Sequence, residues 1–153
     1  MATGYLLDTN ILLRLTRRDS SSHAVIQRAI HQILRQDVSL FCCPQNVVEL
    51  WNVLTRPIDR NGFGLSITEA EEEVRLIERE FGFLPDNRQI HTAWRRLVYD
   101  HSVRGRQVHE ARLIAVMRVY GLSHLLTLNR SDFVRYDGIT VIDPNDLTAP
   151  EYP

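Results

Sequence analysis

Short apolar runs alternate along the chain with longer segments whose apolar residues recur at helical spacing, and this alternation strongly constrains the fold. The short runs predict strands at residues 5–7, 38–43, 83–84, 125–128 and 140–142. Strands that alternate with helices favour a parallel sheet, because each crossover helix packs back onto a face of the sheet. The sequence therefore predicts the α/β class, as one three-layer α/β/α domain with a mostly parallel central sheet.

The segments between these strands carry the signals of helix starts and ends. We expect helices at about residues 11–15, 20–36, 44–55, 68–81, 87–101 and 108–120. Thr68 is assigned to the start of the fourth helix, because Glu71 follows it at capping-box spacing. Two prolines in residues 145–153 predict a loose end of the chain. The domain is therefore expected to cover residues 1–147, with a tail at 148–153.

The basic residues of this chain exclude every site that requires a lysine, because all 18 of them are arginines. A Schiff-base lysine and a P-loop lysine are both excluded. Arginine still binds phosphate well, since its planar fork donates two parallel hydrogen bonds. The formal net charge is only −1, so contact with nucleic acid must depend on local basic patches rather than on a global field.

Cysteine and hydropathy patterns indicate a protein of the reducing cytoplasm. Cys42 and Cys43 are adjacent in an expected strand, where neighbouring side chains point to opposite faces, so they are unsuited to a disulfide. No apolar run approaches the roughly 20 residues that span a bilayer. No export signal opens the sequence, because Asp8 interrupts the first apolar run. We therefore expect cytoplasmic localisation and no membrane partner.

Acidic residues follow the expected strands at one edge of the sheet. Asp8 ends the first strand, Glu49 and Glu110 lie in or near the first turns of later helices, and Asp132 follows the strand at 125–128. Carboxyl ends of parallel strands meet at one edge, so these carboxylates could converge and hold Mg²⁺, which prefers hard oxygen ligands. Each acid alone has a simpler interpretation as a surface charge or a helix cap.

Four stretches share these acids and stand in order along nearly the whole chain. They are Tyr5-Leu6-Leu7-Asp8-Thr9-Asn10-Ile11-Leu12-Leu13, Val47-Val48-Glu49-Leu50-Trp51, Val108-His109-Glu110-Ala111-Arg112-Leu113-Ile114-Ala115 and Leu126-Thr127-Leu128-Asn129-Arg130-Ser131-Asp132-Phe133. Together they resemble the motifs of PIN domains, specifically the VapC-type toxin ribonucleases of bacterial toxin–antitoxin pairs.

The resemblance implies a PIN-like fold and a Mg²⁺- or Mn²⁺-dependent endoribonuclease that hydrolyses RNA phosphodiester bonds. It assigns metal binding and catalysis to Asp8, Glu49, Glu110 and Asp132. The supporting polar residues are Thr9, Asn10, Thr127 and Asn129. It further implies a homodimer and a VapB-like antitoxin as protein partner.

One departure from the family pattern leaves an alternative function open. Glu110 stands where the family usually has aspartate, and Mg²⁺ tolerates displaced ligands poorly. The alternative is a catalytically weakened PIN-fold module that binds RNA or protein. A DNA-directed nuclease of the same fold is a third possibility, and the lack of an additional helical insert argues against it.

Substrate and partner contacts are predicted from position in the sequence. The arginines near the acids are candidates for binding substrate phosphates: Arg14, Arg104, Arg106, Arg112 and Arg130. His109 is close enough to Glu110 to reach the same site, although a structural histidine fits as well. The expected helix with Trp94 and Leu97 is the candidate for an exposed apolar dimer surface.

Overall fold

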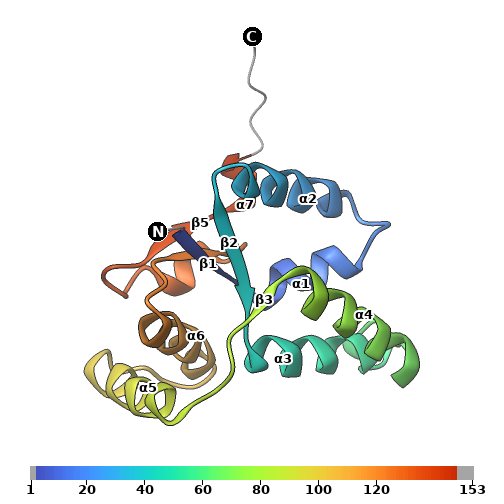
Figure 1. The fold of residues 1–153 in the computed structure, drawn as a ribbon. Helices are drawn as coiled ribbons and strands as arrows, with labels where there is room; N and C mark the ends of the chain where they lie inside the picture. Colours follow the sequence, from blue (N-terminus) through green and yellow to red (C-terminus); the bar gives the residue numbers. More distant parts are fainter. Residues whose placement is uncertain (1–2, 148–153) are drawn as a thin grey trace.

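A parallel sheet with helices on both faces forms the core of the computed structural model, which describes residues 3–147 (Figure 1). Its strands are β1 (Thr3–Leu7), β2 (Val38–Cys42), β3 (Gly82–Phe83), β4 (His124–Leu126) and β5 (Thr140–Ile142). Their order is β3-β2-β1-β4-β5, and every pairing in this described part is parallel. The predicted α/β class and layering are confirmed, with a sheet that is wholly rather than mostly parallel.

Six helices lie between successive strands, and a seventh follows β5. They are α1 (Thr9–Thr16), α2 (Ser21–Leu34), α3 (Pro44–Thr55), α4 (Ile67–Glu80), α5 (Arg88–Asp100), α6 (Gln107–Tyr120) and α7 (Pro144–Leu147). Short 3₁₀ turns add η1 (Ile58–Arg60) and η2 (Arg130–Phe133). No helix in residues 3–147 combines the length and hydropathy needed to span a bilayer.

Successive side chains of β1 point into two different hydrophobic cores. Tyr5 and Leu7 pack into the core that α1, α2, α3 and α4 close, whereas Leu6 packs into the core that α5 and α6 close. Both faces of the strand are therefore buried, as expected for the centre of a parallel sheet. Figure 1 shows α5 and α6 side by side on one flank of the sheet and α4 on the other.

Several helix boundaries differ from the sequence prediction. Helix α1 begins at Thr9 rather than at residue 11, because the Asp8 side chain caps it. The N-cap of α4 is Ser66, two residues before Thr68, since the Ser66 hydroxyl accepts a 3.1 Å hydrogen bond from the Glu69 N–H. The capping box assigned to Thr68 was therefore wrong.

The C-terminal part also differs from the prediction. Residues 144–147 form α7 rather than a loose segment, with Pro144 buried at its first position. A proline fits there because the first N–H of a helix has no intrahelical partner. The predicted tail at residues 148–153 lies outside the described residues.

The apolar face of α5 does not supply the exposed dimer surface that the sequence suggested. Leu97 is buried against α6, and the Trp94 indole N–H donates a 2.8 Å hydrogen bond to the Val108 carbonyl at the start of α6. This face holds α5 and α6 together within one chain. An exposed patch on it was therefore a wrong expectation.

The strand order fixes where a site can form. The chain crosses from β1 to β2 on one side, and β4 later pairs with β1 on the other side. Crossovers that leave in opposite directions open a crevice at the carboxyl ends of the strands involved. Asp8 follows β1 and Thr127 follows β4, so both residues stand at this crevice.

Candidate active site

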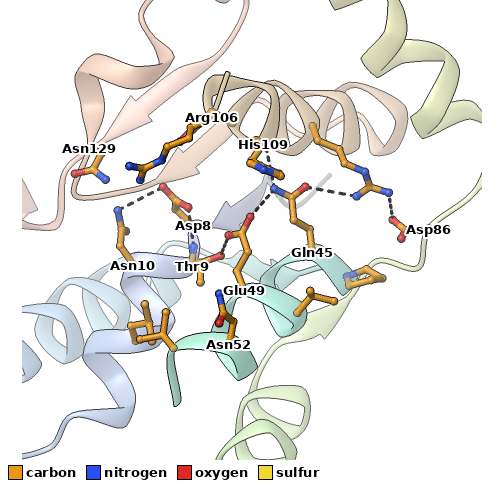
Figure 2. Close-up of a pocket in the computed structure, with 16 residues that line it drawn as sticks. Asp8, Thr9, Asn10, Gln45, Glu49, Asn52, Asp86, Arg106, His109 and Asn129 are labelled. Carbon is orange, nitrogen blue, oxygen red and sulfur yellow. Dashed lines mark hydrogen bonds and ion pairs between the residues drawn. The ribbon is translucent and has the colours of Figure 1, made fainter. Parts of the chain in front are cut away.

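A pocket of about 670 Å³ opens at the carboxyl edge of the sheet. Three acids reach it from separate segments: Asp8 after β1, Glu49 from α3 and Glu110 from the first turn of α6. Figure 2 shows Asp8 and Glu49 pointing into the space between α3 and α6. The fold therefore brings three of the four predicted acids to one pocket.

Asp8 is held in place by Thr127, which follows β4, and by Thr9 at the start of α1. Its Oδ1 accepts a 2.7 Å hydrogen bond from the Thr9 N–H, and its Oδ2 accepts one of 2.7 Å from the Thr127 hydroxyl. Burial raises the pKa of the Asp8 carboxyl from 3.8 to about 6. These two hydrogen bonds act against that rise, and the charges of Glu49 and Glu110 add to it.

Glu49 has a defined partner on each of its two oxygens. The Thr9 hydroxyl donates to Oε2 at 2.6 Å, and the Gln45 amide donates to Oε1 at 2.9 Å. The Thr9 oxygen in turn accepts from the buried Asn46 amide at 3.2 Å, which also donates to the Leu7 carbonyl. These contacts fix the Glu49 carboxylate relative to the end of β1.

Gln45 also connects α3 to the start of α6. The same amide nitrogen donates a 2.8 Å hydrogen bond to the backbone carbonyl of His109, the residue before Glu110. The Arg112 guanidinium donates to the Gln45 carbonyl at 3.5 Å and forms an ion pair of 3.1 Å with Asp86 (Figure 2). Gln45 thus ties the segments that carry Glu49 and Glu110 to each other.

Glu110 has a buried carboxylate oxygen with no hydrogen-bond partner among the described residues, Oε2. A buried carboxylate without a partner is costly unless a proton or a cation neutralises it. Glu110 lines the same pocket as Asp8 and Glu49. The donor set is therefore composed of hard oxygens, which suit Mg²⁺ or Mn²⁺.

The acids are not arranged as a finished metal-binding group. Within residues 3–147, no three His, Cys, Asp or Glu side chains come together in a geometry that could hold an ion. Three carboxylates nevertheless line one pocket, and one of them, Glu110, has a buried oxygen without a hydrogen-bond partner. On these two observations, the residues present fit a divalent cation.

Asp132 is placed apart from the other three acids. It lies half-buried in η2, where its N–H donates to the Asn129 carbonyl, and it is not among the residues that line the pocket. The supporting residue Asn129 does line the pocket. The Asn10 amide bonds to Asp8 at 3.4 Å and to Thr127 at 3.3 Å. Three of the predicted supporting residues thus contact Asp8 directly: Thr9, Asn10 and Thr127.

The structure separates the arginines that the sequence grouped together. Arg106 and Arg112 line the pocket, whereas Arg14 and Arg104 do not. Arg130 forms an ion pair with Asp146 away from the lining, and Arg112 is engaged by Asp86. Arg106 is the pocket arginine with no ion pair among the described residues.

Sequence reasoning missed Gln45, one of the two residues whose side chains bond to Glu49. Gln45 precedes Glu49 by four positions on α3, and side chains at this spacing lie on the same helix face. That spacing was a usable signal. The contact of Gln45 with the His109 carbonyl and the role of Asp86 join segments far apart in the sequence, and no local pattern indicates them.

The lining of the pocket is partly apolar. Leu13, Val48 and Val53 line it together with the Asn52 amide. Val48 is 69% exposed, although its neighbours Val47 and Leu50 are packed into the protein. The pocket is therefore lined by acids, by arginines and by apolar side chains.

Comparison with known proteins places this geometry in a family. The PIN domain model matches residues 5–139 of the chain. A search of curated proteins gave no match.

Solved structures with the same fold come from toxin–antitoxin systems. VapBC2 from Rickettsia felis, bound to a promoter DNA fragment, has a TM-score of 0.68 at 11% identity, covering 92% of this chain and 98% of that chain. DNA-bound VapBC from Salmonella typhimurium has a TM-score of 0.68 at 16% identity, covering 94% and 99%. VapC20 from Mycobacterium tuberculosis, a toxin that cleaves the sarcin–ricin loop, has a TM-score of 0.58 at 18% identity, covering 79% and 86%.

These structural similarities, at identities of 11 to 18%, show a shared fold. The family model adds a match that begins at Tyr5 on β1 and ends beyond η2, so it includes every acid assigned to the site. The resemblance that the four sequence stretches suggested is thereby confirmed, and the chain belongs to the PIN domain family.

Proposed function

We propose that the protein is a divalent-metal-dependent endoribonuclease and the toxin of a VapBC-like toxin–antitoxin pair. The observation that carries the proposal is the convergence of Asp8, Glu49 and Glu110 on one pocket that Arg106 also lines. Membership of the PIN family and the fold shared with VapC20, an RNA-cleaving toxin, support it. A module that only binds RNA would not need three carboxylates in the path of a polyanion.

Asp8, Glu49 and Glu110 would hold the cation, since each lines the pocket and Glu110 has an oxygen without a partner. When bound, Mg²⁺ or Mn²⁺ would supply a Lewis acid and lower the pKa of a coordinated water. Thr9 and Gln45 hold the Glu49 carboxylate in one orientation, and Thr127 holds that of Asp8. Asp132, which is outside the lining, remains a predicted fourth acid of the site.

The walls of the pocket fit the two chemical parts of a ribonucleotide. Arg106 is available for a substrate phosphate, which an arginine fork binds through two hydrogen bonds. Leu13 and Val48 offer the apolar surface that an unstacked base or a ribose can cover. Because bases are accessible in this way only when unpaired, we expect single-stranded RNA as the substrate.

A VapB-like antitoxin is the proposed protein partner. The solved structures that share the fold include VapBC complexes from Rickettsia felis and Salmonella typhimurium. Co-expression with the protein encoded beside it should give a complex that copurifies and lacks ribonuclease activity. A homodimer remains a prediction, which light scattering of the purified chain tests.

The proposed function is tested by cleavage of labelled single-stranded RNA in Mg²⁺, in Mn²⁺ and in EDTA. We expect cleavage with either ion and none in EDTA. The variants Asp8→Asn and Glu49→Gln should reduce cleavage to background, whereas Glu72→Gln, on the exposed face of α4, should match wild type. Cleavage that survives EDTA or both site variants contradicts the proposal, and cleavage of DNA alone assigns a different substrate.

Glu110 decides between an active enzyme and the weakened module considered from the sequence. Its position in the pocket predicts that Glu110→Gln is inactive and that Glu110→Asp retains activity or gains it. A wild-type protein that is inert in both ions, together with an active Glu110→Asp variant, would indicate the weakened module instead.

A further inference from the structure

We propose that the outward face of α5 is a binding track for single-stranded RNA that leads through the α5–α6 turn to the pocket. The RNA track is defined as Arg88, Thr92, Arg95, Arg96 and Tyr99 on α5 with Arg104 in the turn. The inference rests on the proposed ribonuclease function and names the surface that holds the substrate beyond the cleavage site.

Helical spacing gathers the track on one side of α5. Residues 88, 92, 95 and 99 follow one another at intervals of four, three and four, so they form a single stripe along the helix. All four are exposed. Ile90 and Leu97 lie on the opposite side and are buried against α6. The stripe therefore contributes nothing to the core and is free for a partner.

The net charge of residues 88–106, which form α5 and the turn before α6, differs from that of the rest of the chain. Residues 88–106 contain five arginines and one acid, Asp100, in a protein whose formal net charge is −1. In the part of the chain that the structure describes, Arg95 and Arg96 have no ion pair and no side-chain hydrogen bond. By contrast, α4 carries six glutamates and two arginines and packs on the other flank of the sheet (Figure 1). A polyanion is therefore attracted to α5 and repelled from α4.

The track combines the two residue types that hold single strands without sequence preference. Tyr99 is 86% exposed, and together with Arg95 and Arg96 it borders a hollow of about 480 Å³. Arginine binds phosphate oxygens, and an exposed aromatic ring stacks on unpaired bases. A protein or membrane partner would be expected to use apolar side chains, and Tyr99 is the one large hydrophobic residue of α5 that is exposed in the described structure.

The turn between α5 and α6 joins the track to the pocket in a fixed arrangement. The Val103 N–H donates to the Val98 carbonyl at 2.9 Å, which closes the turn onto the end of α5. Arg104 follows in the turn. Arg106 occupies the N-cap position of α6 and lines the pocket. The Trp94 indole N–H on α5 donates a hydrogen bond to the carbonyl of Val108, two residues before Glu110. A single strand of RNA that is bound on α5 is thereby held in a fixed position relative to the acids of the pocket.

The test compares binding and cleavage of RNA of two lengths, about four and about 16 nucleotides, within the range that single-strand sites occupy. The double variant Arg95→Ala/Arg96→Ala is matched by Arg28→Ala/Arg35→Ala, which removes the same charge from two exposed positions, one on α2 and one at its C-cap. Binding is measured by fluorescence anisotropy in EDTA over a series of salt concentrations. Cleavage is measured in Mg²⁺ or Mn²⁺.

We expect the α5 pair to weaken binding of the longer RNA and to reduce the slope of log affinity against log salt by about 1.4, since each phosphate contact to a single strand contributes about 0.7. Tyr99→Ala should weaken binding by on the order of 10-fold through lost stacking, and Tyr99→Phe should restore it. Cleavage of the short RNA should be unchanged in all of these variants.

The RNA track is overturned if the α5 and α2 pairs weaken binding equally, or if the α5 pair slows cleavage of the short RNA as much as that of the longer one. It is also overturned if the α5 pair leaves RNA binding intact and instead weakens binding of the antitoxin. A wild-type protein that cleaves neither RNA contradicts the proposed function, and the anisotropy results for α5 stand apart from that outcome.

Discussion

Thr9 forms hydrogen bonds with two acids of the pocket. Its N–H donates to Asp8 at the end of β1, and its hydroxyl donates to Glu49 on α3. The sequence predicted that Asp8 and Glu49 lie at the carboxyl edge of the sheet, because strand ends and helix starts have local signals, and their metal-binding role stays a prediction. It could not place Gln45 or Asp86, whose contacts with the His109 carbonyl and Arg112 depend on tertiary packing. The positions of charged residues relative to the strands are thus predictable from the sequence, whereas the orientations of their side chains are not.

Asp8→Asn should change the pH dependence of stability in EDTA. The Asp8 carboxyl has a pKa of about 6 in the folded protein and 3.8 when exposed. Its protonated form therefore stabilises the fold fully below pH 3.8, and this contribution is lost as pH rises through 6. By this linkage, a shift of about 2 pKa units corresponds to at most about 3 kcal/mol.

We therefore expect the free energy of unfolding of Asp8→Asn, relative to wild type, to increase between pH 4 and pH 7 and then level off. Denaturant unfolding at a series of pH values measures it. Asp59→Asn, at an exposed aspartate of η1, is the control. A difference between Asp8→Asn and wild type that is constant over this pH range would contradict the assignment.

Gln45→Ala should weaken the response to the metal without unfolding the protein. Glu49 loses the donor to its Oε1, and α3 loses its link to the His109 carbonyl. Residues that orient metal ligands typically contribute about 10- to 100-fold to metal affinity or activity. The Mg²⁺ concentration at half-maximal cleavage should rise accordingly, while Gln36→Ala on the exposed surface leaves it unchanged. An unaltered metal titration in Gln45→Ala would remove its positioning role.

At the scale of elements, the sequence located every strand and the six longer helices but misjudged some of their ends. Periodic apolar positions are repeated several times within an element, so the element itself is strongly encoded. A helix start depends on one capping side chain, and the sequence prediction assigned that of α4 to Thr68. Ser66 accepts the hydrogen bond from the Glu69 N–H, and Thr68 lies inside the helix.

Ser66→Ala should therefore destabilise the protein by about 1 kcal/mol, the usual contribution of a helix N-cap. Thr68→Ala should cost much less, because alanine is the better helix former at an exposed internal position. Chemical denaturation of the two variants distinguishes the positions. If both variants lost equal stability, or if Thr68→Ala lost more, Thr68 rather than Ser66 would be assigned as the N-cap.

Across the whole molecule, the site depends on segments that meet only after folding. Asp8 and Thr127 are 119 positions apart and share a 2.7 Å hydrogen bond, because β1 and β4 pair at the centre of the sheet. The topology was predicted in outline as an α/β/α sandwich, and the order of its strands came from the structure. That order opens the crevice between α3 and α6 and separates the acidic α4 from the basic α5.

Binding of Mn²⁺ or Mg²⁺ should raise the stability of the whole chain, since an ion that binds only the folded protein shifts the folding equilibrium. At a concentration 100 times the dissociation constant the gain is about 2.7 kcal/mol. Thermal unfolding with each ion and with EDTA measures it. Glu49→Gln should show no gain, and Glu72→Gln should show the full gain. A gain of equal size in Glu49→Gln would locate the ion elsewhere.

The orphan oxygen of Glu110 has a consequence for the lifetime of the protein in the cell. A chain that buries unneutralised charge opens more often than one in which that charge is compensated, and proteases degrade the opened form. Any bound cation that reaches this oxygen slows such opening. If the protein binds a metal ion as proposed, its abundance in the cell would therefore rise with the occupancy of its own pocket.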